Sequence, residues 1–291
     1  MASELLNAKG LSQDEKHTSA VLLLVMAEPY DHELEDTTTI DIFEPGSTIE
    51  SEVDSGVVVR VIGWTVLGLI AMVGVTIVVF LPLALLGHVM IDPHSGEVYI
   101  SPVAFVLVSL TEFVLLVPPI LYVRKRHLPL ASIGMKLWKP AQGVAIGIAV
   151  GLVMFGANLL VSAVMYSLPG APDAGNNTIF SDMGIEEAIL GIIVMFVVVG
   201  PSEEVLFRGF LQRRLEIYYR RNHTTYTWWA IIVTSFLFAI THLDLYGIPT
   251  RFVLGVFLGY LAKKRRYSLL APSIAHGLNN ALVIALAFFG V

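Results

Sequence analysis

The chain has 291 residues, of which 55% are hydrophobic and only 14% are charged. About a quarter of the residues of a soluble domain are charged, so this composition excludes an ordinary soluble protein and indicates a membrane protein. The absence of cysteine excludes disulfides and thiolate nucleophiles. With a formal net charge of −6, no nucleic-acid partner is expected.

The charge is distributed unevenly along the chain. Residues 1–56 hold 13 of the 24 acidic residues and only two basic ones, Lys9 and Lys16. This segment has no apolar run of the roughly 20 residues that a membrane span needs. We therefore predict an acidic, mostly disordered cytoplasmic tail over residues 1–56 and a transmembrane helical domain over residues 57–291.

Seven apolar segments follow the tail and predict an all-α, polytopic membrane helix bundle of about seven transmembrane helices. The first three segments are long, whereas polar residues interrupt or shorten the last four. Polar residues inside spans are functional candidates by default, so a catalytic core is expected in the last four helices, and an eighth span or a re-entrant segment is the alternative topology. The predicted spans cover residues 61–86, 102–123, 142–167, 188–215, 227–243, 250–262 and 268–289.

Basic residues in the loops predict the orientation. Lys and Arg cluster after the second, fourth and sixth spans, at 124–126, 213–221 and 263–266, whereas the loops 87–101 and 168–187 contain none. By the positive-inside rule, the N-terminus is cytoplasmic and the C-terminus lies outside. We expect an integral protein of the plasma membrane.

Two adjacent carboxylates, Glu203 and Glu204, directly follow an uncharged apolar run. Glu204 and Arg208 lie four residues apart, so they share a helix face and are expected to form an ion pair. Glu203 points about 100° away and is left without a local partner, which suits a general base. The structural alternative is a helix extension into the cytoplasm, in which Arg208 and the arginines after it balance both carboxylates.

Two further motifs reduce the weight of that alternative. Phe238 and His242 share a face at the end of the fifth span, and His276 and Asn280 share a face inside the last span. Lipid offers these polar side chains no hydrogen-bond partners, so they are expected to meet Glu203 in one buried site. Counted from the span ends at about 1.5 Å per residue, however, Glu203 would lie about 5–15 Å nearer the inner face than His242.

The residue types suit attack of water on an acyl carbon, which is peptide-bond hydrolysis. In this reading Glu203 and His242 activate the water, while His276 and Asn280 hold the oxyanion. No cofactor is needed. The alternative is a zinc site formed by His242, His276 and Glu203; against it, the chain has no His-Glu-x-x-His helix.

The chain resembles the CAAX-protease and bacteriocin-processing (CPBP) family of intramembrane endopeptidases, which includes the Ras-converting type of CAAX prenyl protease. The resemblance covers residues 179–290 and includes Gly255-x-x-x-Gly259 and the approach from Ser268 to His276. It implies a glutamate-dependent protease with Glu203 as the catalytic glutamate and Glu204, Arg208 and Phe238 as supports of the site. The motifs that carry it are Glu203-Glu204-x-x-x-Arg208, Phe238-x-x-x-His242 and His276-x-x-x-Asn280.

The resemblance implies a membrane protein or lipidated peptide as substrate, with a prenylated CAAX-type protein as one candidate. The rival within the family is a non-catalytic scaffold or immunity protein. The presence of all four candidate catalytic residues argues against it. A proton-coupled transporter would predict internal repeats, and the halves of the chain are not similar. The sequence does not indicate an oligomeric state.

Three other features inside the spans have structural interpretations. We expect Glu112 in the second span to form a structural hydrogen bond to a neighbouring helix. Asn158 in the third span is expected to bind neighbouring helices together through its carboxamide. Gly255 and Gly259 predict close helix packing rather than a substrate groove.

Overall fold

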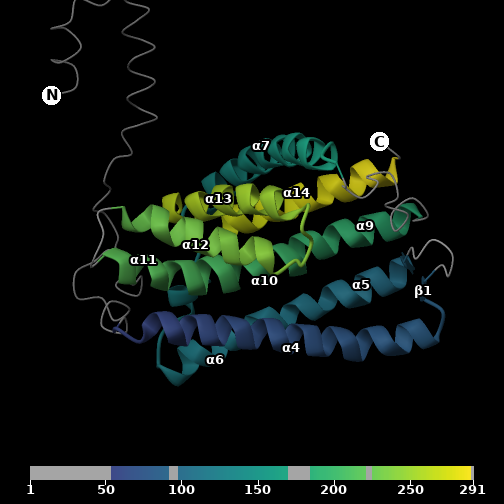
Figure 1. Ribbon diagram of the computed structural model, residues 1–291. Coiled ribbons are helices and arrows are strands. Elements are labelled where there is room, and N and C mark those ends of the chain that lie inside the picture. Colours follow the sequence, from purple (N-terminus) through teal and green to yellow (C-terminus); the bar gives the residue numbers. More distant parts are fainter. Residues whose placement is uncertain (1–53, 92–97, 170–183, 221–224, 290–291) are drawn as a thin grey trace, which may run out of the picture. The chain divides into compact units, whose positions relative to one another are not determined.

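The computed structural model describes residues 54–91, 98–169, 184–220 and 225–289, and these residues are almost entirely helical (Figure 1). Within these described residues the first helix is α4, which begins at Val57. The predicted disordered tail lies, up to residue 53, outside the described residues.

Seven helical stretches correspond to the seven predicted spans. Five of them are long and apolar enough to cross a membrane: Val57–Leu85, Pro102–Lys125, Pro140–Tyr166, Ile185–Arg220 and Leu270–Phe288. The other two, α12 (Tyr226–Ile240) and α13 (Ile248–Lys264), are shorter. The predicted all-α polytopic bundle is confirmed, with one small addition: strands β1 (Val89–Ile91) and β2 (Val98–Ile100) form an antiparallel pair after α4.

Three of the long stretches each consist of one continuous helix. The first is α4 (Val57–Leu85), the third is α7 (Pro140–Tyr166) and the last is α14 (Leu270–Phe288). The second stretch is composite, because a short 3₁₀ segment interrupts it just before Pro118 and Pro119. Its parts are α5 (Pro102–Leu110), η1 (Thr111–Leu116) and α6 (Val117–Lys125), and the 3₁₀ turn η2 (Leu130–Ile133) follows.

The stretch Ile185–Arg220 is the centre of the fold. Of the residues in its apolar 18-residue segment 61% are buried, against 11% in the corresponding segment of α4. The stretch runs between the layer of α4–α6 and the layer of α12–α14 (Figure 1). Two π-helical segments lie within it, on either side of a five-residue α-helix that contains Pro201. Proline donates no backbone hydrogen bond, and π-helical turns often occur at functional sites. The parts are α9 (Ile185–Val194), η3 (Met195–Val199), α10 (Gly200–Glu204), η4 (Val205–Gln212) and α11 (Arg213–Arg220).

Two glycines allow α13 to approach its neighbours closely. A Cβ atom at Gly255 would lie 2.8 Å from the Ser235 side chain of α12, and one at Gly259 would lie 2.7 Å from the Gln212 side chain. Both distances are shorter than a van der Waals contact. The prediction that these glycines serve close helix packing is therefore confirmed.

Candidate active site

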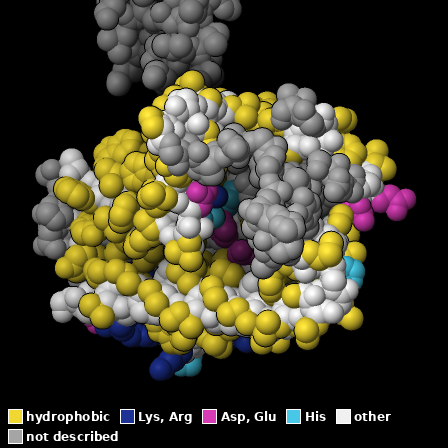
Figure 2. All heavy atoms as spheres, turned by 45° about the vertical axis from the view of Figure 1, so that its right-hand side comes forward, with side chains coloured by type: hydrophobic (Ala, Val, Ile, Leu, Met, Phe, Trp, Pro, Cys, Tyr) yellow, Lys and Arg dark blue, Asp and Glu magenta, His cyan; other side chains and the backbone are white. Residues whose placement is uncertain are grey.

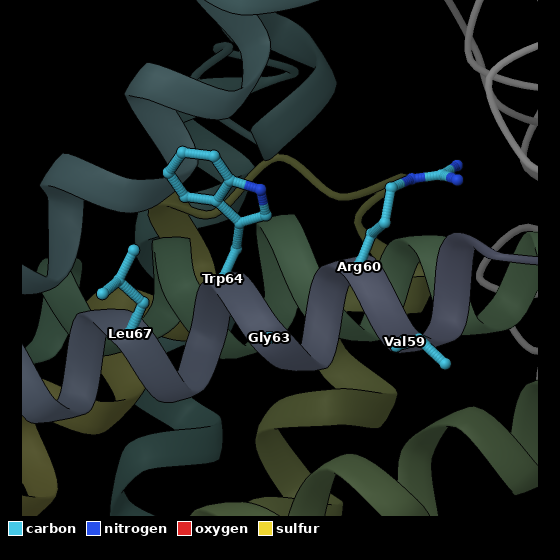
Figure 3. Close-up of a pocket in the computed structure, with 5 residues that line it drawn as sticks. All are labelled: Val59, Arg60, Gly63, Trp64 and Leu67. Atoms are coloured by element: carbon cyan, nitrogen blue, oxygen red, sulfur yellow. The ribbon is translucent and has the colours of Figure 1, made fainter.

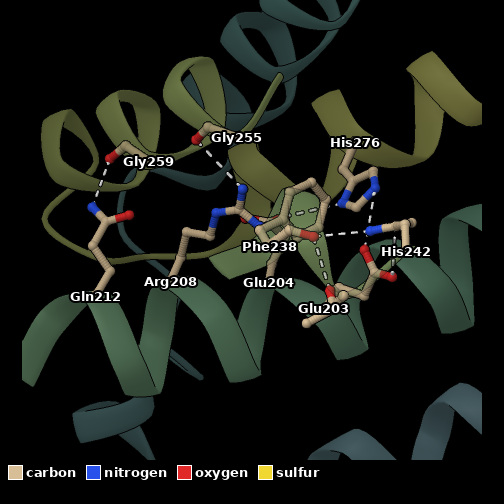
Figure 4. A network of polar contacts seen from close by, with 10 residues as sticks. Glu203, Glu204, Arg208, Gln212, Phe238, His242, Gly255, Gly259 and His276 are labelled. Atoms are coloured by element: carbon tan, nitrogen blue, oxygen red, sulfur yellow. Dashed lines mark hydrogen bonds and ion pairs between the residues drawn. The ribbon is translucent and has the colours of Figure 1, made fainter. Parts of the chain in front are cut away.

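The candidate site is built around a buried ion pair. Arg208 Nη1 donates to Glu204 Oε1 at 2.9 Å, and both side chains are completely buried, as the four-residue spacing predicts (Figure 4). Arg208 also donates to the carbonyl oxygen of Gly255 at 3.4 Å, and its guanidinium lies 4.4 Å from the ring centre of Phe238. These contacts compensate the desolvation of the two charges, which would otherwise be unfavourable in an apolar bundle.

His276 is oriented by this ion pair. Its Nδ1 lies 3.0 Å from Glu204 Oε1. An ionised carboxylate only accepts hydrogen bonds, so Nδ1–H is the donor, and Nε2 is directed to the other side of the ring. There it lies 3.5 Å from Glu203 Oε2.

His242 reaches the same carboxylate from another helix. It follows α12, and its Nδ1 donates to the carbonyl oxygen of Phe238 at 2.9 Å. This bond again leaves Nε2 free of a hydrogen in the neutral ring, and Nε2 lies 4.0 Å from Glu203 Oε1. The Phe238 ring packs edge-on against both imidazoles, at 5.0 Å from His242 and 5.8 Å from His276.

Glu203 therefore lies between two imidazole nitrogens without a hydrogen bond to either. Among the described residues its buried Oε2 has no hydrogen-bond partner, and the separations of 3.5 Å and 4.0 Å are too long for a direct bond. A carboxylate oxygen and the Nε2 of a neutral His242 are both acceptors. Two facing acceptors require a donor of two hydrogens between them, and water is such a donor.

The site is open on one side. The His242 side chain is 29% exposed, whereas Glu203 is 9% exposed. In the space-filling view, acidic and histidine side chains are visible inside a hollow among apolar side chains (Figure 2). Water would therefore reach Glu203 past His242.

The expected difference in depth between Glu203 and His242 is wrong. The fourth span continues to Arg220, five residues beyond the predicted end at 215, and begins at Ile185. Glu203 consequently lies in the middle of a 36-residue helical stretch and at the level of His242, two residues after the end of the short α12.

Asn280 is placed differently from the other three candidate residues. It follows His276 by four residues on α14, and its Oδ1 accepts a hydrogen bond from Asn279 Nδ2 at 3.1 Å. Within the described part of the chain it makes no hydrogen bond to Glu203, His242 or His276. Its amide nitrogen is not used in that bond and remains a donor.

Two charged residues near the site, Glu112 and Arg251, were not predicted to be catalytic. Glu112 in η1 has a buried Oε2 without a hydrogen-bond partner among the described residues, so the expected structural hydrogen bond is not found there. The η1 segment that carries it packs against α10, which carries Glu203. Arg251 on α13 pairs with Asp244, two residues after His242, at 2.7 Å. In both cases the available signal was a charged residue inside a predicted span.

The histidine and carboxylate side chains are not arranged as an evident metal centre. Across residues 54–91, 98–169, 184–220 and 225–289, no three histidine or carboxylate side chains are arranged to hold one metal ion. Nδ1 of His276 and Oε1 of Glu204 are already bound to each other.

A hollow of about 240 Å³ on α4 lies away from these residues (Figure 3). It is lined by Val59, Arg60, Gly63, Trp64 and Leu67, which all belong to one helix. It contains no carboxylate and no histidine, so it offers no hydrolytic chemistry.

Comparisons with known proteins agree with this geometry. Residues 185–282 match the family model described as "Type II CAAX prenyl endopeptidase Rce1-like". An uncharacterized 24.3 kDa protein of Escherichia coli is 29% identical over 131 residues, which are 44% of this chain and 56% of that protein. The aligned stretch thus spans little more than half of that relative, and no solved structure matches the chain. The matched residues carry Glu203, Glu204, Arg208, Phe238, His242, His276 and Asn280. Residues 185–282 are therefore similar to a type II CAAX prenyl endopeptidase Rce1-like domain, which is consistent with the resemblance to the CPBP family.

Proposed function

We propose that this protein is an intramembrane endopeptidase that hydrolyses a peptide bond by means of a water molecule activated by Glu203 and His242. The observation that carries the proposal is the pair of unbonded acceptors, Glu203 Oε1 and His242 Nε2, which face each other at 4.0 Å. A water placed between them donates one hydrogen to each and turns a lone pair towards the substrate.

The reaction follows from these positions. Glu203 removes a proton as the water oxygen attacks the acyl carbon, and the carbonyl oxygen becomes an oxyanion. The Nδ2–H of Asn280 donates to this oxyanion, as does Nε2–H of His276 when both nitrogens of that ring are protonated. Glu203 then transfers its proton to the amide nitrogen, the C–N bond breaks, and a carboxylic acid and an amine are formed. The acid passes its remaining proton to the amine, so that a carboxylate and an ammonium group leave.

The supporting residues keep these groups in place. Arg208 neutralises Glu204, and Glu204 fixes His276 through Nδ1. The backbone carbonyl of Phe238 fixes His242 in the same way. Each imidazole thus has one nitrogen bound to the protein and the other directed to Glu203.

The substrate that this arrangement favours is a membrane-associated protein. The site lies among apolar helices, and the matched family is described by its action on CAAX prenyl proteins. We propose an integral plasma-membrane protein with a cytoplasmic N-terminus and an outward C-terminus, in agreement with the basic loops. The described residues contain no observation that favours a transporter or a non-catalytic scaffold.

The test is cleavage by the purified protein in proteoliposomes. Internally quenched peptides that end in a CAAX sequence are supplied with and without a farnesyl group. Wild-type protein should cleave one of them, and Glu203→Gln should lower kcat by about 10³-fold, because it removes the general base. Glu186→Gln, an exposed acid on the same long helix, is the matched control and should keep full activity.

Chelation separates the metal-free route from the zinc alternative. A strong zinc chelator should leave cleavage unchanged in the route proposed here and should abolish it if His242, His276 and Glu203 hold a metal. Unchanged cleavage by Glu203→Gln would reject Glu203 as the base.

A further inference from the structure

Asn280 is the end of a series of hydrogen-bonded polar side chains, the polar chain, that connects three helices. The polar chain begins at Thr250 on α13, whose Oγ1 lies 3.3 Å from Ser162 Oγ on α7. Ser162 Oγ donates to Asn158 Oδ1 at 3.2 Å, and Asn158 Nδ2 donates to Asn279 Oδ1 on α14 at 3.3 Å. Asn279 Nδ2 donates to Asn280 Oδ1 at 3.1 Å.

All of these hydrogen bonds run in one direction. Ser162 uses its hydrogen for Asn158, so Thr250 is the donor to Ser162. Each of the two inner carboxamides then accepts through its oxygen and donates through its nitrogen. At Asn280 the oxygen is occupied and the NH₂ group is left as the free donor of the chain.

This direction determines which end of the Asn280 carboxamide is available. If the Asn280 amide turned over, its NH₂ would face the NH₂ of Asn279, and two donors would oppose each other. Asn279 is only 2% exposed, so water does not readily replace the lost acceptor. Thr250, at the other end of the chain, is 5% exposed.

We propose that Asn279 and Asn158 are positioning residues, which hold the carboxamide of Asn280 with its NH₂ group available to the oxyanion. The proposal rests on the oxyanion role of Asn280 in the function proposed above. It also gives Asn158 more than the expected role of an interhelical contact, because the same hydrogen bond that joins α7 to α14 sets the direction of the chain.

The first test is Asn279→Asp. The aspartate has nearly the same shape but two acceptor oxygens when ionised, so the Asn280 amide should turn its NH₂ towards it. Removal of one oxyanion donor lowers kcat by roughly 10²- to 10³-fold, and we expect a loss of about tenfold or more in kcat with KM within about twofold of wild type. Asn158→Leu, which breaks the chain one step earlier, should lower kcat by about threefold to tenfold. It is the second variant if Asn279→Asp does not fold.

The decisive measurement is a double-mutant cycle with Asn280→Ala in the same proteoliposome assay. If Asn279 acts through Asn280, then Asn279→Asp lowers kcat in the wild-type background and has no further effect in the Asn280→Ala background. Ser167→Ala is the matched control, because this hydroxyl, on the residue that follows α7, donates to the Val164 carbonyl outside the polar chain.

The outcomes distinguish this inference from the proposed function. Loss of kcat in Asn280→Ala with independent, additive losses from Asn279→Asp or Asn158→Leu overturns the positioning role and leaves the protease proposal intact. Full activity of Asn280→Ala, together with loss in Glu203→Gln, overturns the oxyanion role of Asn280 and this inference with it. Loss of kcat in Asn280→Ala with a non-additive cycle supports both.

Discussion

Two clusters of polar side chains are each centred on a buried glutamate of the stretch Ile185–Arg220. They differ in how completely the hydrogen-bonding capacity of that glutamate is used. The Glu203 cluster consists of Glu203, His242 and His276. The Glu216 cluster consists of Glu216, Thr227, Lys263 and Tyr267. Glu203 and Glu216 are thirteen residues apart, or about 20 Å along a helix.

In the Glu216 cluster the carboxylate is saturated. Glu216 is 1% exposed, and its Oε1 accepts from Thr227 Oγ1 at 2.8 Å and from Lys263 Nζ, while Oε2 accepts from the Tyr267 hydroxyl. Burial, together with the neighbouring Glu216, raises the pKa of the Tyr267 phenol well above its usual range, so it remains a donor. Such a cluster holds α11, α12 and α13 together and leaves no position for a substrate.

In the Glu203 cluster the carboxylate is nearly as buried but faces imidazoles beyond hydrogen-bond distance. Burial and charge are thus common to both clusters and do not by themselves locate an active site. Unfilled hydrogen-bonding capacity beside oriented imidazoles distinguishes the Glu203 cluster, because a reaction needs groups that are free to bind water and substrate.

The largest expected effects come from exchanging glutamate for glutamine in each cluster. Glu203→Gln should abolish most activity, about 10³-fold in kcat, and should leave the free energy of unfolding unchanged or higher, since no hydrogen bond is lost and a buried charge is removed. Glu216→Gln should lower the free energy of unfolding by about 2–4 kcal/mol, because the ion pair with Lys263 is lost. Its folded fraction should keep kcat within about twofold. Cleavage rates and unfolding in mixed micelles measure both quantities.

Equal stability losses in the two variants would contradict the distinction between the clusters. The conservative variant Glu216→Asp is the control for side-chain charge. It retains the carboxylate and should lose less stability than Glu216→Gln if the ion pair is the main contribution.

The second prediction concerns Arg208, which supports the Glu203 cluster through Glu204. Arg208→Met leaves Glu204 completely buried without its cation, and we expect the free energy of unfolding to fall by about 3–5 kcal/mol. Adding Glu204→Gln removes the unpaired charge and should restore most of the stability. Activity should stay low in the double variant, because His276 loses its charged acceptor; recovery of activity along with stability would show that Glu204 has no orienting role.

Much of this organisation follows from sequence. Apolar runs predicted all seven helical stretches, and four-residue spacing predicted the Glu204–Arg208 pair. The predicted depth of Glu203 was wrong because the end of a span is set by tertiary contacts: α11 continues past residue 215, and Arg213, Arg214 and Glu216 are buried against neighbouring elements. Hydropathy treats such residues as the end of a membrane segment.

The direction of the polar chain through Asn158 and Asn279 also required the structure. Spacing relates residues on one helix, as for His276 and Asn280. It does not indicate which residue of α7 faces α14, because α7 is apolar around most of its circumference and has no distinct polar face. Glu112 was recognisable as unusual from its place in a span, but its proximity to Glu203 was not.

The third prediction concerns Glu112, which lies near Glu203. Its buried Oε2 has no hydrogen-bond partner among the described residues, as in the Glu203 cluster and unlike Glu216. Glu112→Gln should therefore leave the free energy of unfolding within about 0.5 kcal/mol of wild type or raise it. It should lower kcat by about threefold to tenfold, because one carboxylate beside Glu203 is removed. A loss of stability without a change in kcat would place Glu112 with the structural residues.

The smallest effect is expected at the exposed edge of the site, where Asp244 pairs with Arg251 just after His242. Burial works to raise the pKa of Asp244, but hydrogen bonds from Arg251 and from the Gly247 backbone outweigh it and hold the pKa below its usual value of 3.8. A group with a lowered pKa contributes its stability above the ordinary value and loses it only as the pH falls through the lower one. The pair is therefore constant between about pH 5 and 8. Asp244→Asn should lower kcat/KM by about twofold, by the same factor at every pH in this range, because Arg251 is released near His242. A factor that varies with pH between 5 and 8 would mean that Asp244 titrates with the catalytic groups and belongs to the Glu203 cluster.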